Sequence, residues 1–229
     1  MRIGVVQFPG SCDERDALRA LELVGAEPTL LWHGEADLAG SEAIVLPGGF
    51  TYGDYLRTGA VAQFAPVMEA VGEFAARGGP VLGICNGFQV LCEAGLLPGA
   101  LTRNAGLRFV HRSQHVRVET PGVWLDAPRG AVLEIPVKHG EGRYVIDDPD
   151  GLAARGQVLL RYSDATGAVT AEANPNGSVA GIAGVTNPDG NVAGLMPHPE
   201  HAVEALLGSV DGRAVLGAVL RRTAAVERA

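Results

Sequence analysis

Short runs of apolar residues alternate with amphipathic segments along the first hundred residues, and this alternation limits the possible folds most strongly. The runs predict strands, because they are brief and bounded by glycine, proline or charged residues. They are RIGVVQF (2–8), EPTLLW (27–32), EAIVLP (42–47), PVLGI (80–84) and, later, VAGLMP (192–197). Strands that are apolar on both faces are typical of parallel sheets covered by helices. The order therefore predicts an α/β doubly wound fold, with a mostly parallel sheet flanked by helices.

The segments between the runs have helical spacing. In residues 11–25, Ser11 and Glu14 have the spacing of a capping box, which predicts a helix start. The apolar face of this helix is Ala17, Leu21 and Val24. A second helix is predicted from about Gly59 to Arg77 and a third over 86–97, and two helical stretches close the chain. The apolar positions of the second are Val61, Phe64, Met68, Val71 and Phe74.

Between Leu101 and Gly194 the pattern changes to short alternating runs separated by Gly, Pro, Asn and Asp. RFVHRSQHVRVE, AVLEIPV, GQVLLRY and SVAGIAG are such runs, and they predict an additional antiparallel β region. No linker, repeat or low-complexity tract separates this region from the rest. We therefore predict one domain over residues 1–229.

Composition excludes several classes of function. The formal net charge is −8 and the basic residues do not cluster, so a nucleic-acid interface is not expected. No run of 18 apolar residues predicts a membrane span, and the first residues do not resemble a secretory signal. Three scattered cysteines indicate neither a disulfide framework nor a zinc site, which favours a reducing cytoplasm. Lys138 is the single lysine and no GxxxxGK[ST] motif occurs, so a Walker-type ATP site is not expected.

Three loops follow predicted strands, at the sheet edge where α/β proteins bind ligands: 47–54, 84–89 and 196–201. The middle loop, GICNGFQ, has the form G-x-C-x-G between a strand and a helix. This is the arrangement of a nucleophile elbow, with the sulfur of Cys85 in place of a serine oxygen. The positive end of the following helix favours a thiolate at that position. The alternative is a cysteine that packs as a small hydrophobe at a strand end.

A thiolate nucleophile requires a base, and the base requires a group that orients it. In MPHPEH (196–201), Pro199 favours an extended conformation at His198, so that His198 and Glu200 point the same way. We predict that Glu200 accepts one imidazole N–H while the other nitrogen faces Cys85. A surface His–Glu pair at a turn is one alternative. A His–Glu–His metal cluster is a weaker one, because Pro199 excludes the helical spacing of a zincin and no third ligand is evident.

The glycine pair Gly48–Gly49, which follows the strand at 42–47, exposes backbone N–H groups. One of these N–H groups, together with that of Asn86, has the chemistry of an oxyanion hole. A simple glycine turn is the alternative. The three loops together are more specific than any one of them.

The motifs resemble a known family. GICNGFQ and PHPE are similar to the class I (triad) glutamine amidotransferases. PGGFTYGDYLRTGA, GICNGFQVLCEAGLLPG, HGEGRY and MPHPE resemble, more narrowly, the glutaminase subunit of phosphoribosylformylglycinamidine synthase. The likeness runs from FPGS near the start to HPE near the end, which is essentially the whole chain.

The resemblance implies a mechanism and residue roles. Cys85 attacks the side-chain amide of glutamine, ammonia leaves, and water hydrolyses the thioester to glutamate. His198 is the general base and acid, and Glu200 orients it. Gly49 and Asn86 supply the oxyanion-hole N–H groups. Gln89 and Phe50 are implied near the bound glutamine.

The resemblance also implies partners. The ammonia passes to a large ATP-dependent synthetase subunit, which converts formylglycinamide ribonucleotide to the amidine in purine synthesis, and a small third subunit helps assembly. No cofactor and no metal are expected in this chain; ATP and Mg²⁺ are expected on the synthetase. His201 stands where the family usually has arginine, so no contact of that arginine carries over. His139 and Glu141 border either the glutamine pocket or the partner surface, or form a structural turn, and Cys12 and Cys92 are assigned no chemistry.

Two other functions are compatible with the motifs. A stand-alone cysteine hydrolase of similar fold would act on another amide or a peptide, although such relatives commonly lack GGFTYGDYLR and HGEGRY. A non-catalytic assembly module is disfavoured by the complete Cys–His–Glu set.

Overall fold

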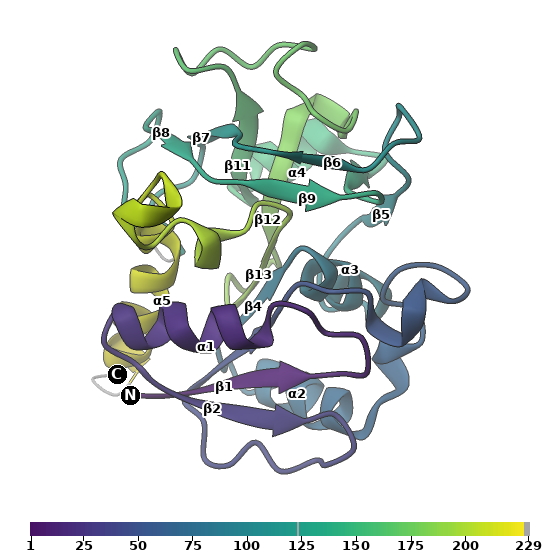
Figure 1. Ribbon diagram of the computed structural model, residues 1–229, viewed down its shortest axis with the longest axis vertical. Helices are drawn as coiled ribbons and strands as arrows, with labels where there is room; N and C mark the ends of the chain where they lie inside the picture. Colours follow the sequence, from purple (N-terminus) through teal and green to yellow (C-terminus); the bar gives the residue numbers. More distant parts are fainter. Residues whose placement is uncertain (123, 227–229) are drawn as a thin grey trace.

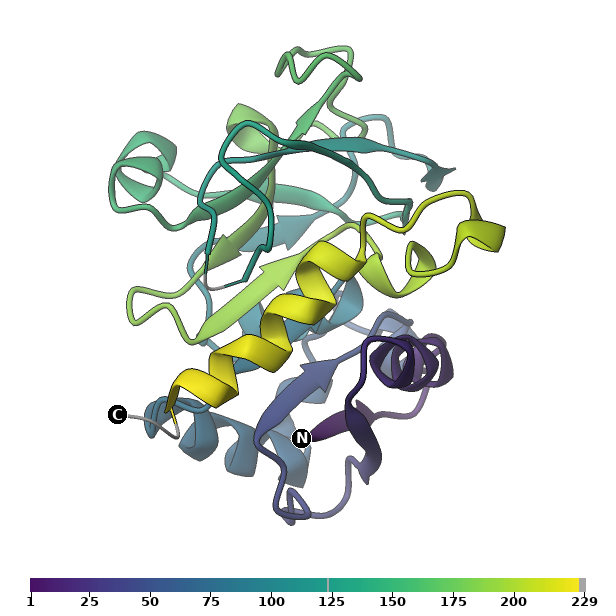
Figure 2. The same ribbon diagram turned by 90° about the vertical axis from the view of Figure 1, so that its left-hand side faces the viewer.

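The computed structural model describes residues 1–122 and 124–226, and its first half alternates strands and helices as expected (Figure 1). The apolar runs form strands that end within one or two residues of their predicted limits. The elements are β1 (Arg2–Gln7), α1 (Glu14–Leu23), β2 (Glu27–Trp32), β3 (Ala43–Leu46), α2 (Pro66–Ala76), β4 (Val81–Ile84) and α3 (Asn86–Glu93). Helices α1 and α2 lie on opposite sides of the sheet (Figure 2), which confirms the doubly wound arrangement.

A nine-stranded sheet runs through the molecule in the order β2-β1-β3-β4-β13-β12-β11-β7-β8. The first five strands are parallel, and β13 pairs with β4 from Val192 opposite Val81 to Leu195 opposite Ile84. The remaining four pair antiparallel. Their bounds, with that of β13, are β7 (His115–Val118), β8 (Val132–Glu134), β11 (Val158–Ser163), β12 (Ile182–Thr186) and β13 (Val192–Leu195). The predicted antiparallel region therefore continues the parallel sheet rather than forming a separate layer.

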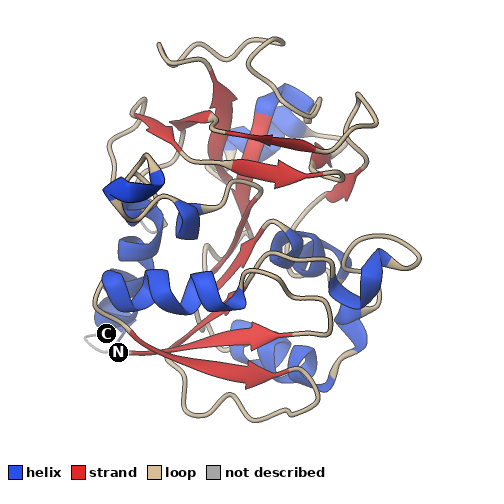
Figure 3. Ribbon diagram, viewed as in Figure 1, coloured by secondary structure: helices blue, strands red, loops and turns tan. Residues whose placement is uncertain are grey.

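The other strands form two small antiparallel sheets (Figure 3). The loop at residues 139–142, which is described with the site below, connects one of these sheets to the other. One pairs β5 (Ala100–Thr102) with β10 (Arg143–Val145), and the other pairs β6 (Val110–Arg112) with β9 (Val137–His139). The remaining elements are α4 (Pro149–Ala154), α5 (Arg213–Val226) and the 3₁₀ turns η1 (Thr51–Asp54), η2 (Ala62–Phe64), η3 (Val179–Gly181), η4 (Pro199–His201) and η5 (Ala205–Leu207).

The position of a strand relative to the core determines whether its sequence is a continuous apolar run. Every residue of β3, β4 and β13 is buried, because these central strands are covered on both faces. Strand β2 differs, since it lies at the edge of the sheet and only Leu31 of its six residues is buried. The expectation that each strand is apolar on both faces is therefore wrong for β2.

Three local predictions about helices are also wrong. Asp13, not Ser11, is the N-cap residue of α1, and the hydroxyl of Ser11 instead accepts a hydrogen bond from the Phe8 N–H. The second helix begins at Pro66, because proline is favoured in the first turn of a helix and excludes a helical conformation before it. Phe64 is consequently 80% exposed. The two closing helices are one helix, α5, preceded by two 3₁₀ turns.

None of the described helices is long and apolar enough to cross a membrane. One sheet joins both halves of the chain. A single domain over 1–229 stays a prediction, and its residues 123 and 227–229 lie outside the described part.

Candidate active site

Cys85 lies in a tight turn between β4 and α3, with φ 50° and ψ −102°. A non-glycine residue in this region is strained, and such strain persists only where the surroundings fix it. Here the Cys85 N–H donates to the Leu195 carbonyl (2.8 Å) and the Cys85 carbonyl accepts from the Gln89 N–H (3.2 Å). The turn is therefore tied to β13 on one side and to α3 on the other.

The two glycines of the turn allow α3 to approach the sheet closely. A Cβ atom at Gly87 would lie 2.0 Å from the Leu46 carbonyl oxygen of β3. A Cβ atom at Gly83 would lie 2.6 Å from the Leu91 side chain and 2.7 Å from the backbone of Gly87. Side chains at these positions would push the helix away from β3 and β4. The G-x-C-x-G pattern thus has the elbow geometry that it predicts.

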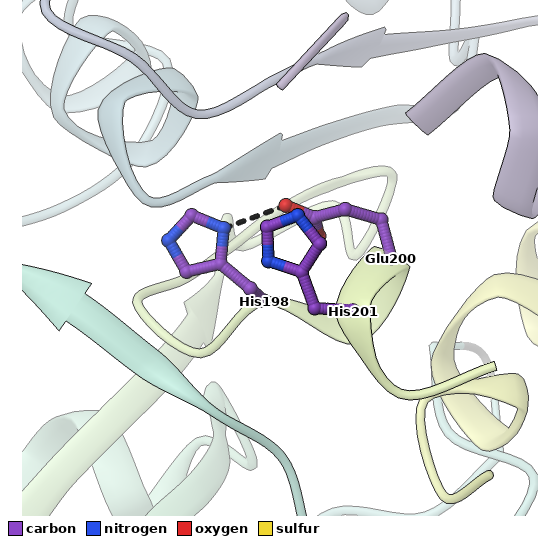
Figure 4. Close-up of side chains that lie close together, drawn as sticks. All are labelled: His198, Glu200 and His201. Carbon is purple, nitrogen blue, oxygen red and sulfur yellow. Dashed lines mark hydrogen bonds and ion pairs between the residues drawn. The ribbon is translucent and has the colours of Figure 1, made fainter. Parts of the chain in front are cut away.

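His198 and Glu200 contact each other directly after β13 (Figure 4). His198 Nδ1 lies 2.6 Å from Glu200 Oε1, and both side chains are buried. The backbone route differs from the extended dipeptide that we predicted, because Pro199 and Glu200 form the 3₁₀ turn η4. The His198 N–H donates to the Pro136 carbonyl (2.8 Å), which fixes the start of this turn.

Electrostatics favour the charged forms of both groups. Burial lowers the pKa of His198, but the charge of Glu200 and the nearby Cys85 sulfur outweigh it and raise this pKa to about 10. Burial raises the pKa of Glu200, and the His198 imidazole reverses the effect and lowers it. His198 Nε2 is buried and makes no hydrogen bond to any described residue. The Cys85 sulfur is nevertheless near enough to raise the pKa of the imidazole. This nitrogen is therefore available to exchange a proton with a group bound beside Cys85.

The paired side chains of Asp13 and Lys138 lie on the Nδ1 side of His198, and no motif in the sequence indicates this pair. Asp13 Oδ2 lies 3.6 Å from His198 Nδ1, while Asp13 Oδ1 pairs with Lys138 Nζ at 2.5 Å. The Asp13 side chain is only 5% exposed, so Lys138 supplies the charge that a buried carboxylate requires. These residues are 125 positions apart and share no local motif. An aspartate at the start of α1 was the only signal available.

The His201 ring packs against the ring of His198. The two rings are stacked, with centroids 5.3 Å apart and planes inclined by 11° (Figure 4). His201 Nε2 lies 3.1 Å from Asp16 Oδ2. One potential ligand atom from each of His198, Glu200 and His201 falls within 4.8 Å of the others. Stacked rings direct their nitrogens side by side rather than toward one point, so this cluster suits hydrogen bonding better than metal ligation.

The loop of Gly48 and Gly49 packs on residues 10–13. A Cβ atom at Gly49 would lie 2.7 Å from the Gly10 carbonyl oxygen, and the Cys12 and Asp13 N–H groups both donate to the Gly48 carbonyl (3.2 Å). Within the described residues, the N–H groups of Gly49 and Asn86 donate to no acceptor. Two unpaired donors thus lie on the loops that flank Cys85.

These loops enclose a pocket of about 210 Å³. It is lined by Cys12, Asp13, Gly49, Phe50, Asp54, Thr58, Cys85, Gln89, Phe109, Lys138, His139, Gly140, Glu141 and His198. Phe50 is half exposed at this pocket, 6.5 Å from the ring of Phe109. The Gln89 amide accepts from Asn86 Nδ2 (2.8 Å) and donates to the Glu141 carbonyl (2.5 Å). The structure therefore brings Gln89 and Phe50 to the pocket, with Gln89 already holding the 139–142 loop.

His139 belongs to the pocket wall and to a buried network at once. Its Nδ1 lies 3.1 Å from Asn104 Oδ1 and its Nε2 3.4 Å from Asn176 Nδ2. Burial and the charge of His198 lower the pKa of His139 to about 4, so it is neutral near pH 7. Cys12 is exposed at the pocket, whereas burial raises the pKa of the Cys92 thiol on α3.

Comparison with known proteins covers nearly the whole chain. Residues 1–214 match the model of the CobB/CobQ-like glutamine amidotransferase domain. "Phosphoribosylformylglycinamidine synthase subunit PurQ" of Frankia casuarinae is 56% identical over 225 residues, 96% of this chain and 93% of that protein. The protein of the same description from Salinibacter ruber is 56% identical over 231 residues, 98% of each chain.

Solved structures agree in fold. A chain in the structure of PurLQS from Thermotoga maritima superposes with a TM-score of 0.86 at 43% identity, covering 96% of this chain and 97% of that one. A putative GMP synthase protein from Thermoplasma acidophilum has a TM-score of 0.67 at 17% identity and covers 100% and 96% of the two chains, which supports the fold alone.

Proposed function

The chain belongs to the CobB/CobQ-like glutamine amidotransferase family and, within it, to the glutaminase subunits of phosphoribosylformylglycinamidine synthase, and on that premise we propose how its residues act. Cys85, His198 and Glu200 form the catalytic triad that hydrolyses glutamine to glutamate and ammonia. Support comes chiefly from one observation: the strained Cys85, the His198 of the buried His–Glu pair and Gly49, whose N–H has no acceptor among the described residues, line one pocket.

In the first half-reaction, the Cys85 thiolate attacks the side-chain amide carbon of glutamine. The N–H groups of Gly49 and Asn86 stabilise the oxyanion that develops on the amide oxygen. Because Glu200 keeps His198 protonated, His198 Nε2 can give its proton to the leaving nitrogen, and the C–N bond breaks to release ammonia. A thioester between Cys85 and the glutamyl group remains.

In the second half-reaction, the neutral His198 accepts a proton from water as that water attacks the thioester carbon. The same backbone N–H groups stabilise the second oxyanion. When this intermediate collapses, the C–S bond breaks, glutamate forms, and Cys85 returns to the thiolate beside a protonated His198. Glu200 forms and breaks no covalent bond; its role is to accept the hydrogen bond from Nδ1–H of His198 and so to orient the ring.

We propose further that the ammonia reaches a separate synthetase subunit, which uses it to make formylglycinamidine ribonucleotide. The similarity to a chain of the Thermotoga maritima PurLQS structure supports an assembly with a large and a small partner. ATP and Mg²⁺ are proposed to bind the synthetase, because this chain has no Walker motif. A cytoplasmic location is proposed, in accord with free thiols at Cys12, Cys85 and Cys92.

Separating the two reactions tests this proposal. In a complex reconstituted with the synthetase, the small subunit, ATP and formylglycinamide ribonucleotide, Cys85→Ala should form no product from glutamine. The same complex should form product from concentrated ammonium salt, because the synthetase site requires only ammonia. Cys92→Ala, on the helix α3 that follows Cys85, is the matched control and should behave as wild type with both nitrogen sources.

Three results would contradict the proposal. Glutamine-dependent activity of Cys85→Ala near wild type would reject the nucleophile. A requirement for Cys85 with ammonium supplied would reject the division of labour between subunits. Preferential hydrolysis of other amides or peptides by the wild-type chain would favour the stand-alone hydrolase.

A further inference from the structure

Asp54 occupies an unusual place in the wall of the pocket. It ends the turn η1, in which Tyr52 (φ 53°), Gly53 (φ 69°) and Asp54 (φ 56°) are all left-handed, followed by Leu56 (φ 70°). The Thr51 N–H donates to Asn86 Oδ1 (3.2 Å) and the Tyr52 N–H to the Pro9 carbonyl (2.7 Å), so the turn is attached to the Cys85 helix and to the loop after β1. Asp54 is thus held at a fixed position relative to Cys85.

The carboxylate of Asp54 lacks a compensating partner. Its Oδ1 atom is buried and receives no hydrogen bond from any described residue. Burial, and then the neighbouring charge of Glu141, raise the pKa of Asp54 to about 6. Near pH 7 the pocket therefore holds a partly buried negative charge, which is costly unless a cation or donor is supplied.

The residues around Asp54 do not supply that cation. Lys138, the only lysine or arginine among the described residues that line the pocket, is paired with Asp13. The two carboxylate oxygens of Glu141 are already engaged, one by the Thr58 hydroxyl (3.2 Å) and one by the exposed Arg103 guanidinium (3.5 Å). Glu141 therefore adds negative charge beside Asp54 without satisfying it. A bound molecule that carries a positive group would therefore complement this carboxylate.

The size of the pocket restricts that molecule. A volume of about 210 Å³ is below the range of about 300–1,000 Å³ that is typical of drug-sized ligands, so a small amino acid amide suits it. Such a substrate carries an amide, which must reach Cys85, and an α-ammonium group at its other end. The acidic wall of Asp54 and Glu141 is the part of this pocket whose charge complements an ammonium group.

We propose that Asp54, with the negative charge of Glu141 beside it, binds the α-ammonium group of the substrate and makes the pocket select amides that carry one. This inference rests on the proposed function and specifies how its substrate is recognised. Asp54 is a specificity-determining residue: it contacts the end of the substrate remote from the scissile bond. Its removal should therefore act mainly on KM, because binding by a remote group is nearly equal in the ground and transition states.

The test compares glutamine with 4-carbamoylbutanoate, which has the same amide and carboxylate but no α-ammonium group. Asp54→Asn should raise the KM for glutamine by about 10–100-fold, the range expected for one hydrogen bond to a charged group, with kcat changed by less than about threefold. We expect 4-carbamoylbutanoate to be a poor substrate of the wild type, and Asp54→Asn should not lower its kcat/KM. Asp54→Glu should have a KM for glutamine between those of the wild type and of Asp54→Asn. Asp189→Asn, at the opposite end of β13, is the surface control and should match wild type.

A second measurement needs no variant. Wild-type Cys85 should be alkylated faster by a glutamine-like chloroketone than by the same reagent without its α-ammonium group, as followed by mass spectrometry. An unchanged KM for glutamine in Asp54→Asn, an equal loss with both substrates, equal alkylation rates, or a loss that appears only in the complex with the synthetase would each overturn the inference. Failure of the wild type to hydrolyse glutamine would instead reject the proposed function.

Discussion

His198 keeps its proton to unusually high pH because Glu200 lies 2.6 Å from Nδ1. Its pKa is raised from an unfolded value of about 6.5 to about 10, so it binds the proton more tightly when folded. By linkage, the stabilisation is fully present below about pH 6.5 and is lost as the pH rises through about 10. The same shift predicts that the protonated imidazole, which the proposed first proton transfer requires, is present throughout the neutral range.

Glu200→Gln tests this role of the carboxylate. The variant should retain more glutaminase activity than His198→Ala, because base and nucleophile remain in place, whereas His198→Ala should approach Cys85→Ala in severity. The pKa of His198 should fall in Glu200→Gln, so the basic limb of the pH–rate profile should move to lower pH. Steady-state rates measured from about pH 5 to about pH 10 would show this. An unmoved basic limb, or a loss greater than that of His198→Ala, would contradict the assignment.

Some residues of the candidate site could be predicted from a short stretch of sequence, and others could not. Cys85, His198 and Glu200 could be identified because each lies in a short motif at a strand end, where α/β folds place ligands. Asp13 and Asp54 could not, because their significance depends on partners far along the chain. Asp13 is explained by Lys138, and Asp54 by the charge of Glu141 and an oxygen without a partner.

At the scale of elements, the packing of α3 on β3 places Cys85. Gly87→Ala puts a methyl group 2.0 Å from the Leu46 carbonyl, so we expect the free energy of unfolding to fall by about 1–3 kcal/mol. Glutaminase activity should fall as well, since the turn carries both Cys85 and the Asn86 N–H. Gly72→Ala is the matched control: its methyl group meets no atom within 4 Å in the middle of α2, and we expect stabilisation of about 0.4–1 kcal/mol. Urea unfolding of both variants gives the comparison, and wild-type stability of Gly87→Ala would refute this account of the turn.

Elements were predictable where burial alone decides them. β3, β4 and β13 are buried on both faces, so their sequences are uninterrupted apolar runs. Helix starts were less predictable, because Ser11 has capping chemistry but its hydroxyl bonds within the preceding turn. The apolar residue Phe64 fits a helical period but precedes Pro66, and its side chain is exposed. Local backbone chemistry overrode periodicity at both positions.

At the scale of the whole molecule, one sheet carries both the loops of the candidate site and the antiparallel region of the chain. β13 pairs with β4 on one side and with β12 on the other, so His198 follows the strand at which the parallel and antiparallel parts meet. The 139–142 loop, which begins with the last residue of β9, borders the pocket. The later half of the chain therefore helps to form the candidate site, although its strands were predicted only as an attached β region.

The final prediction concerns control of this site by its partners. The wild-type chain alone should hydrolyse glutamine slowly, and the rate should rise when the synthetase, the small subunit, ATP and formylglycinamide ribonucleotide are added. The physical reason is that the Gly49 N–H lies in a glycine loop beside exposed side chains, Phe50 at 49% and Leu56 at 87%, which a docked partner can contact. Alignment of one oxyanion donor is worth roughly 10²–10³ in rate, so an activation of that order is expected. Glutamate release measured with and without the synthetase gives the ratio, and omission of ATP and the ribonucleotide is the control for docking alone. A full glutaminase rate in the isolated chain would show that the oxyanion hole is formed without a partner.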